Sequence, residues 1–183
     1  SKLKNFFFFS VILLLWQSYA HAQCGSVNFT ASKTTGCAPF GVTFIGTNIP
    51  TGAKVEWDLG GGFVTGTDTA FRIFTVSGKK DIKLKITLSG QTSACTTVVK
   101  QNIVDVLPKP EINLWRSDSL LCNGGANVQF IDSTVGVATR QWIYDGTSQS
   151  ATGVTITKFA SVGNHSLNLI VKNSFGCESI YKN

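Results

Sequence analysis

Hydrophobic and polar residues alternate in short segments through most of the chain. The alternation is clearest in residues 82–86 and 167–171, where Ile, Leu or Val stands at every second position. A period of two places one face of a β-strand against a core and the other face in solvent. No stretch combines a helical apolar period with capping residues. The pattern therefore predicts an all-β protein.

The same pattern occurs twice, which predicts an internal repeat. Three pairs of residues share one offset of 85 positions: Trp57 and Trp142, Phe74 and Phe159, and Gly78 and Gly163. Short strands separated by frequent turns are typical of a two-sheet sandwich, and a repeat decides the architecture before any single motif does. We expect two tandem β-sandwiches, each of two sheets.

The predicted strands fill both copies. They cover residues 27–32, 42–45, 53–59, 69–75, 80–88 and 96–106, and then 111–116, 127–132, 139–144, 153–159, 165–172 and 178–182. Two prolines in residues 108–110 favour a stiff, extended linker. The predicted domains are therefore 23–107 and 111–183. The last strand of the second domain is shorter than its counterpart, so we expect a piece of a longer chain.

Large aromatic residues recur at matching places and are the predicted core. These residues are Trp57, Trp142, Phe44, Phe130, Phe74 and Phe159. The alternative role for the two tryptophans is a stacking platform for sugar. We favour the core, because both indoles hold the same position relative to the turn and to the alternating strand.

The first 22 residues resemble a secretory signal peptide. Lys2 and Lys4 precede an apolar segment at 6–16, and Ala20-His21-Ala22 is a small-x-small cleavage site. This segment of eleven residues, interrupted by Ser10, falls short of the roughly 20 that a spanning helix needs, so the membrane anchor is the weaker alternative. We expect a secreted or cell-surface protein with no membrane span after cleavage.

Five cysteines remain after the leader, and an oxidising compartment would pair them. Cys37 and Cys95 hold the same places in the first copy as Cys122 and Cys177 hold in the second. The simplest prediction is one bridge in each domain, Cys37–Cys95 and Cys122–Cys177. Cys24 is then left over, either free or paired outside this segment. Metal binding is disfavoured, since no Cys-x-x-Cys is present and His165 is the one histidine after the leader.

Charge is low for a nucleic-acid-binding protein. The formal net charge is +6, and two of the lysines belong to the leader. Lys83 and Lys85 alternate with apolar residues and are expected on a solvated strand face. Nucleic-acid binding requires a denser basic stripe with interleaved aromatic residues, so we expect no such partner.

Several motifs resemble the PKD domain, an immunoglobulin-like sandwich of extracellular proteins. Residues 57–62, Trp-Asp-Leu-Gly-Gly-Gly, are similar to its Trp-Asp-Phe-Gly-Asp-Gly hallmark, and residues 74–78 are similar to its aromatic-x-x-x-Gly segment. The Gly-Cys-Ala-Pro start resembles PKD repeats of large secreted proteins of the Bacteroidota. Three positions depart from the family: Gly61 replaces an Asp, and Lys80 and His165 replace Tyr.

The resemblance implies a non-catalytic spacer or adhesion module of a larger exported surface protein, of the gliding-motility or type IX-secreted kind. Its partners would be an extracellular protein or carbohydrate ligand and other domains of the same chain. The alternative is an accessory region of a secreted protease or glycosidase. We expect no cofactor, with calcium as the weaker alternative, because Asp58, Asp68 and Asp145 stand singly.

Enzymatic chemistry is not expected within this segment. A Ser-His-Asp arrangement would have to use His165, which the pattern places as an exposed residue of a strand. Residues 60–62 lack the Lys-Ser/Thr and the following helix of a phosphate-binding loop.

Overall fold

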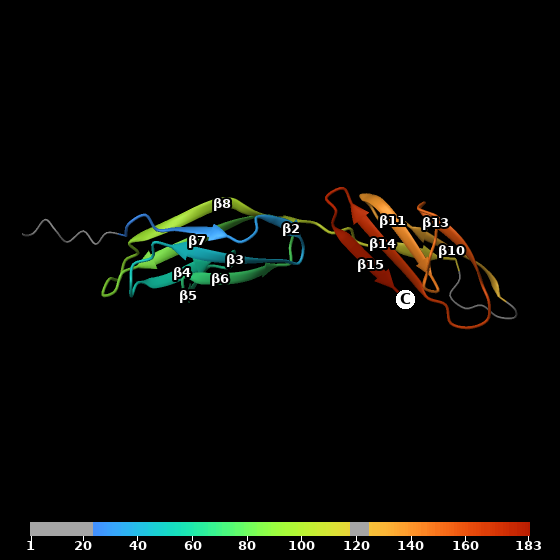
Figure 1. Cartoon of the computed structure of the whole chain (residues 1–183), viewed down its shortest axis with the longest axis horizontal. Helices are drawn as coiled ribbons and strands as arrows, with labels where there is room; N and C mark the ends of the chain where they lie inside the picture. The colour runs from blue at the N-terminus through green and yellow to red at the C-terminus, as the bar shows by residue number, and fades with distance from the viewer. Residues whose placement is uncertain (1–23, 118–124) are drawn as a thin grey trace, which may run out of the picture. The chain divides into compact units, whose positions relative to one another are not determined.

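The computed structural model describes residues 24–117 and 125–183, all in strands, turns and loops (Figure 1). The predicted leader and Cys122 lie outside these residues. The all-β prediction is confirmed, since the described segments contain no helix. It follows that none of them provides a helix able to cross a membrane.

Contacts divide the chain into two compact units. The first consists of Ser1–Thr34, Gly41–Arg72 and Lys80–Val104, and the second of Thr35–Phe40, Ile73–Lys79 and Asp105–Asn183. The domain boundaries expected at residues 107 and 111 stay a prediction.

The first eight strands form two sheets, in the orders β1-β3-β6 and β2-β8-β7-β4-β5. The strands are β1 (Asn28–Ala31), β2 (Thr35–Cys37), β3 (Phe40–Thr47), β4 (Lys54–Asp58), β5 (Phe63–Gly66), β6 (Thr69–Phe74), β7 (Gly78–Thr87) and β8 (Thr96–Leu107). All their described pairings are antiparallel except that of β2 with β8.

The last seven strands form sheets in the orders β13-β10-β9 and β12-β11-β14-β15. These strands are β9 (Leu114–Arg116), β10 (Ala126–Asp132), β11 (Val137–Tyr144), β12 (Thr147–Ser148), β13 (Thr155–Ala160), β14 (Leu167–Asn173) and β15 (Glu178–Lys182). Their described pairings are all antiparallel.

Three short strands were not predicted. β5 exposes all four of its residues, so it has no alternation of burial to detect. β2 and β12 have only three and two residues. All three are strands because they pair with a neighbouring strand. Their own sequences show no alternation of apolar and polar residues that would have predicted them.

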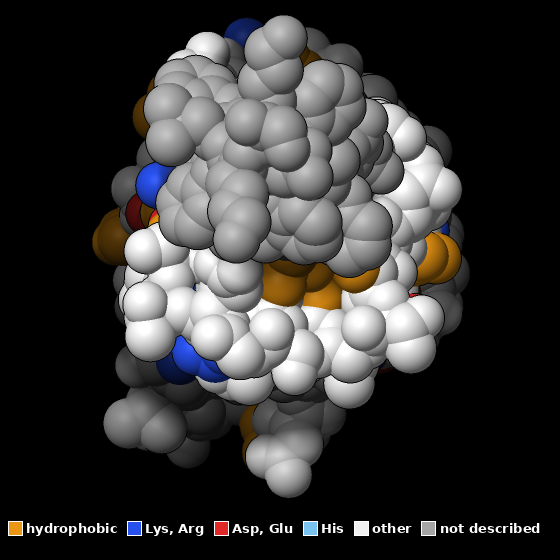
Figure 2. Space-filling model, turned by 90° about the vertical axis from the view of Figure 1, so that its left-hand side faces the viewer, with side chains coloured by type: hydrophobic (Ala, Val, Ile, Leu, Met, Phe, Trp, Pro, Cys, Tyr) orange, Lys and Arg blue, Asp and Glu red, His pale blue; other side chains and the backbone are white. Residues whose placement is uncertain are grey.

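The core of the first unit forms where aromatic residues from facing sheets meet. Phe29 packs edge-on against Trp57 with ring centroids 5.4 Å apart, and Phe44 lies 6.2 Å from the same indole. The alternating residues of β7 complete this layer, and Leu84 stands directly opposite Trp57 across the β4–β7 ladder. In Figure 2, the part of the view not drawn in grey shows few Lys or Arg side chains and a group of hydrophobic side chains near its centre.

The second unit repeats this arrangement around Trp142, which is fully buried on β11 and stands opposite Leu169 on β14. The two indole N–H groups donate to backbone carbonyls at similar distances along the chain. Trp57 Nε1 donates to Thr67 O at 2.9 Å, and Trp142 Nε1 donates to Gly153 O at 3.0 Å. A buried indole needs such a partner, so each hydrogen bond fixes a segment beyond its own hairpin.

Phe159 is the exception among the six predicted core aromatics, because its side chain is 62% exposed. On β13 the buried residues are Ile156 and Ala160, so Phe159 points to the opposite face. Ala160 of β13 therefore takes the inward position that Phe74 holds in β6, and it comes one residue after Phe159. A one-residue slip exchanges the two faces of a strand, and the constant offset of 85 concealed it.

The predicted disulfide pairing is wrong. Cys24 is bonded to Cys95, and Cys37 is bonded to Cys177. Cys95 comes just before β8, whereas Cys37 pairs with Leu107 at the far end of that strand. The 12 residues of β8 extend about 40 Å, while bonded cysteines need Cα atoms within roughly 7 Å. Equivalent positions in a repeat therefore did not identify the partners.

We expect non-reducing peptide mapping to recover Cys24–Cys95 and Cys37–Cys177. Both bridges close long loops, of 71 and 140 residues in sequence separation. Replacing Cys24 and Cys95 together by Ser should therefore reduce the free energy of unfolding by about 2–5 kcal/mol, measured by denaturant titration. A peptide joining Cys37 to Cys95 would contradict the structure.

Candidate functional site

The turn after β4 is organised by one carboxylate. Asp58 Oδ1 accepts hydrogen bonds from the amides of Gly60, Gly61 and Gly62 at 3.0, 3.2 and 3.0 Å. Gly60 and Gly62 have φ values of +94° and +91°, which a residue with a Cβ rarely adopts. The sequence Asp-Leu-Gly-Gly-Gly therefore folds into a tight turn around its own aspartate.

Asp58 also faces Lys83 on β7, with Oδ2 at 3.2 Å from Nζ. Burial by itself raises the pKa of Asp58. The hydrogen bond from Gly60, the contact with Lys83 and the hydrogen bonds from Gly62 and Gly61 outweigh burial, so the pKa lies below its ordinary value. The carboxylate is thus charged and fully engaged at neutral pH.

This turn forms one wall of a pocket of about 370 Å³ in the first unit. The opposite wall is β6, an edge strand of its sheet, and β5 is the edge strand of the other sheet. The lining residues are Trp57, Leu59, Gly61, Gly62, Val64, Thr65, Gly66, Thr69, Ala70, Phe71 and Arg72. The pocket is therefore the open space between the edges of the two sheets.

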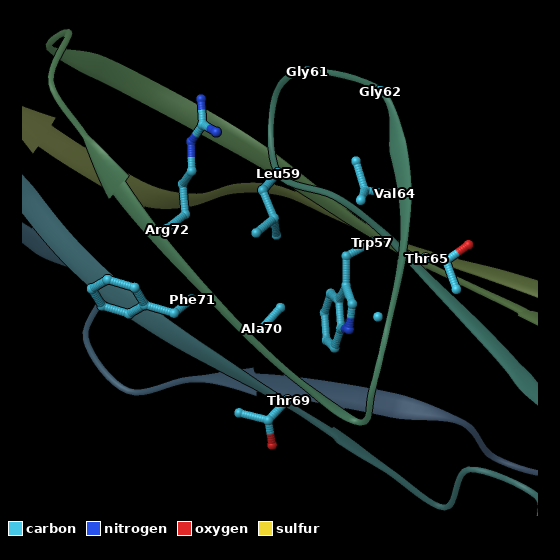
Figure 3. A pocket seen from close by; sticks show the side chains of 11 residues that line it. Trp57, Leu59, Gly61, Gly62, Val64, Thr65, Thr69, Ala70, Phe71 and Arg72 are labelled. Atoms are coloured by element: carbon cyan, nitrogen blue, oxygen red, sulfur yellow. The ribbon is translucent and has the colours of Figure 1, made fainter.

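Figure 3 shows Trp57 and Leu59 between the glycine turn and β6, the strand that carries Ala70, Phe71 and Arg72. Val64 and Phe71 are 68% and 62% exposed. Gly66 of β5 lies beside the indole, where a Cβ would be in ordinary van der Waals contact with Trp57 Cδ1 at 3.4 Å. The walls are mainly apolar, with two threonine hydroxyls and one guanidinium.

The lining suits binding and not acid–base catalysis. Residues 57–72 are all described, and the pocket-lining residues among them include no Asp, Glu, His or Cys. Arg72 is the one charged side chain in the lining. A ligand here would be held by contact with apolar surface and by a cation at the rim.

A second cluster surrounds His165 in the second unit. His165 Nδ1 lies 2.7 Å from Asp145 Oδ2, and His165 Nε2 lies 3.0 Å from the carbonyl oxygen of Ser161. The ring stacks on Tyr144 with centroids 5.6 Å apart. His165 therefore lies in the loop before β14, half-buried, and its predicted placement as an exposed strand residue is wrong.

The cluster brings Ser161, His165 and Asp145 together, with Ser161 Oγ 3.4 Å from Nε2. Both ring nitrogens nevertheless face acceptors. The hydrogen bond to Asp145, followed by the one to the Ser161 carbonyl, raises the pKa of His165 above its ordinary value. A general base needs a free ring nitrogen lone pair, so this geometry stabilises an imidazolium and does not activate the serine.

Asp58 and Asp145 each have partners within the protein. Within residues 24–117 and 125–183, no three His, Cys, Asp or Glu side chains gather in a way that would hold a metal ion. Asp58 is occupied by glycine amides and Lys83, and Asp145 by His165 and the amide of Ser166. The weaker alternative of calcium binding stays untested.

Sequence reasoning missed both clusters as units. The pocket involves β5, which has no periodic signal, and it depends on two strands becoming sheet edges. The partners of His165 are 20 and 4 residues away in sequence, and nothing in their spacing indicates a shared loop cluster. The Asp58 turn was the detectable part, because three consecutive glycines predict positive φ.

No known protein family matches this chain, and no curated protein does. Among solved structures, the fibronectin(III)-like modules of Clostridium thermocellum CbhA match at 15% identity and a TM-score of 0.32, covering 85% of this chain and 91% of theirs. Murine CEACAM1b matches at 13% identity and a TM-score of 0.37, covering 86% of this chain and 97% of its own. The Yersinia pseudotuberculosis adhesin InvE matches at 12% identity and a TM-score of 0.34, covering 87% of this chain and 58% of its own.

We expect Asp58→Ala to destabilise the first unit by about 1–3 kcal/mol, because three amides and Lys83 lose their partner. The pKa of Asp58 is lower in the folded state than in the unfolded state, where it is near 3.9. The ionised carboxylate therefore stabilises the fold at pH values above the unfolded-state pKa, and this stability is lost as pH falls through the folded-state pKa. The acid limb of stability should therefore flatten in Asp58→Ala, measured by thermal unfolding between pH 2 and 7. Asp68→Ala, at an exposed position, is the matched control, and an equal effect in both variants would refute the assignment.

The raised pKa of His165 predicts the opposite pH dependence. Its contribution to stability is fully present below the unfolded pKa near 6.5 and is lost as pH rises through the folded pKa. NMR titration of the ring should give a value above 6.5, and Asp145→Asn should move it back down. An unchanged titration in Asp145→Asn would show that the pair does not form in solution.

Proposed function

We propose that this chain is a non-catalytic extracellular module that binds a ligand or spaces other parts of a larger exported surface protein. The two disulfides support export, because persistent disulfides require an oxidising compartment. The chain would then act outside the cytoplasm, where small sandwiches depend on covalent cross-links for part of their stability.

One observation carries the non-catalytic assignment: the side chains that could perform chemistry are engaged by structural partners. Asp58 accepts three turn amides, and His165 is held between Asp145 and a backbone carbonyl. By contrast, the pocket at the sheet edges is open and mainly apolar. Such surfaces are suited to recognition.

The finer proposal, a gliding-motility or type IX-secreted surface protein, rests on the resemblance of residues 57–62 to the PKD hallmark. The second candidate is an accessory region of a secreted protease or glycosidase. Both place catalysis, if any, elsewhere in the same polypeptide. The coding sequence beyond residue 183 distinguishes them, since a catalytic domain supports the second and further repeats support the first.

The test is a turnover assay on the folded chain from residue 23 onward, with both disulfides formed. Ester, peptide and glycoside substrates should all remain intact, because the lone histidine of the Ser161 cluster has no free nitrogen. His165→Ala is the matched control. Turnover by the parent chain that disappears in His165→Ala would overturn the non-catalytic assignment, whereas turnover equal in both would identify a contaminant and leave it standing.

A further inference from the structure

We propose that the outer face of the β13-β10-β9 sheet is a binding platform for a neutral polysaccharide. This proposal rests on the proposed function, in that the chain binds and does not react, and it adds the site and the ligand class. β10 and β13 lie side by side in Figure 1, and the printed register places their residues in rows across the sheet.

Two aromatic residues stand on this face. Trp115 on β9 is 53% exposed and lies opposite Ile131 of β10. Phe159 on β13 is 62% exposed and lies opposite Asn127. Aromatic rings of this size are usually buried, and here their alternation directs both outward. The face therefore presents two flat apolar surfaces.

The Phe159 ring is held in place by the backbone beneath it. Gly125 has a φ of +90°, and a Cβ at that position would lie 2.9 Å from Phe159 Cζ and 2.5 Å from the carbonyl oxygen of Ala160. Only glycine allows this approach of ring to chain. The ring thus rests against Gly125 while most of it faces solvent.

Polar but uncharged side chains fill the positions between the rings. Gln129 is exposed at the centre of β10, and Thr157 lies opposite it on β13. Ser117 contacts Gln129 from the other side, where its amide donates to the Gln129 carbonyl at 2.9 Å. Amides and hydroxyls both donate and accept hydrogen bonds, as sugar hydroxyls do.

The face carries no charge among its described residues. The outward positions are Asn113, Trp115, Ser117, Asn127, Gln129, Ile131, Thr155, Thr157 and Phe159. Arg116 and Lys158 fall at the alternate positions of β9 and β13, so they belong to the other face. In a chain with a net charge of +6, an uncharged patch matches a neutral polymer and offers no cation to a phosphate or sulfate.

The spacing of the rings indicates an extended ligand. They are four residues apart along β10 and two strands apart across the sheet. With about 3.3 Å per residue and about 4.8 Å between strands, the rings stand roughly 16 Å apart. A single sugar cannot contact both, whereas a chain of several sugars can stack on each ring and reach Gln129 between them.

The test is affinity electrophoresis and pull-down of the full chain from residue 23 with neutral polysaccharides, namely cellulose, chitin, xylan and mannan. At least one should retain the protein, and Trp115→Ala and Phe159→Ala should each weaken binding about tenfold or more. Phe175→Ala is the matched control, since Phe175 is 61% exposed in the β14–β15 loop. Gln129→Ala should weaken binding with no change in thermal stability.

Three results would overturn the proposal. Retention unchanged in Trp115→Ala and Phe159→Ala would place the site elsewhere. Retention only by sulfated or uronic-acid polymers, or by collagen, would show a different class of ligand. Failure to bind any of these polymers would refute the platform while leaving the non-catalytic assignment intact, because that assignment depends on the separate turnover assay with His165→Ala.

Discussion

Each sandwich depends on a buried indole whose N–H must find an acceptor inside the protein. Trp57 and Trp142 are 3% and 0% exposed, and each donates to a carbonyl 10 or 11 residues further along the chain. Burial of so large a side chain provides much of the core, but only if the hydrogen bond is made. The indole therefore has two structural roles. Its ring packs in the core and holds its own strand there, and its N–H binds a carbonyl of the edge segment that follows along the chain.

This constraint leaves the functional chemistry at the edges and outer faces. Asp132 is a buried polar group that is paired: it is 2% exposed and receives a hydrogen bond from Arg140 Nε at 2.6 Å as well as one from Thr134. Within the described residues, the buried hydroxyl of Tyr144 is an exception, with no hydrogen-bond partner. An unpaired group there would cost its full desolvation energy. In the proposed function, recognition uses side chains that the core does not need, on β5, β6, β9 and β13.

Much of the fold was predictable, because alternation is a direct consequence of strand geometry. The strands around Leu84 and Leu169 were found on that signal. What could not be predicted depends on pairing between distant segments. Cys37 and Cys95 hold the same places in the first copy as Cys122 and Cys177 hold in the second, yet the length of β8 separates Cys37 from Cys95. Only the three-dimensional path brings Cys24 to Cys95 and Cys177 to Cys37. The cluster of Asp145 and His165 was missed for the same reason.

The error over Phe159 has a further consequence. A repeat conserves the order of strands, but a slip of one residue in register exchanges the two faces of a strand. In the first copy this position turns Phe74 inward, where it is 6% exposed; in the second, Ala160 takes the inward place and Phe159 turns outward. The core of the second unit loses an aromatic ring and its outer face gains one. A slip of one residue in register can therefore change which side chains a strand presents to the core and which it presents to solvent.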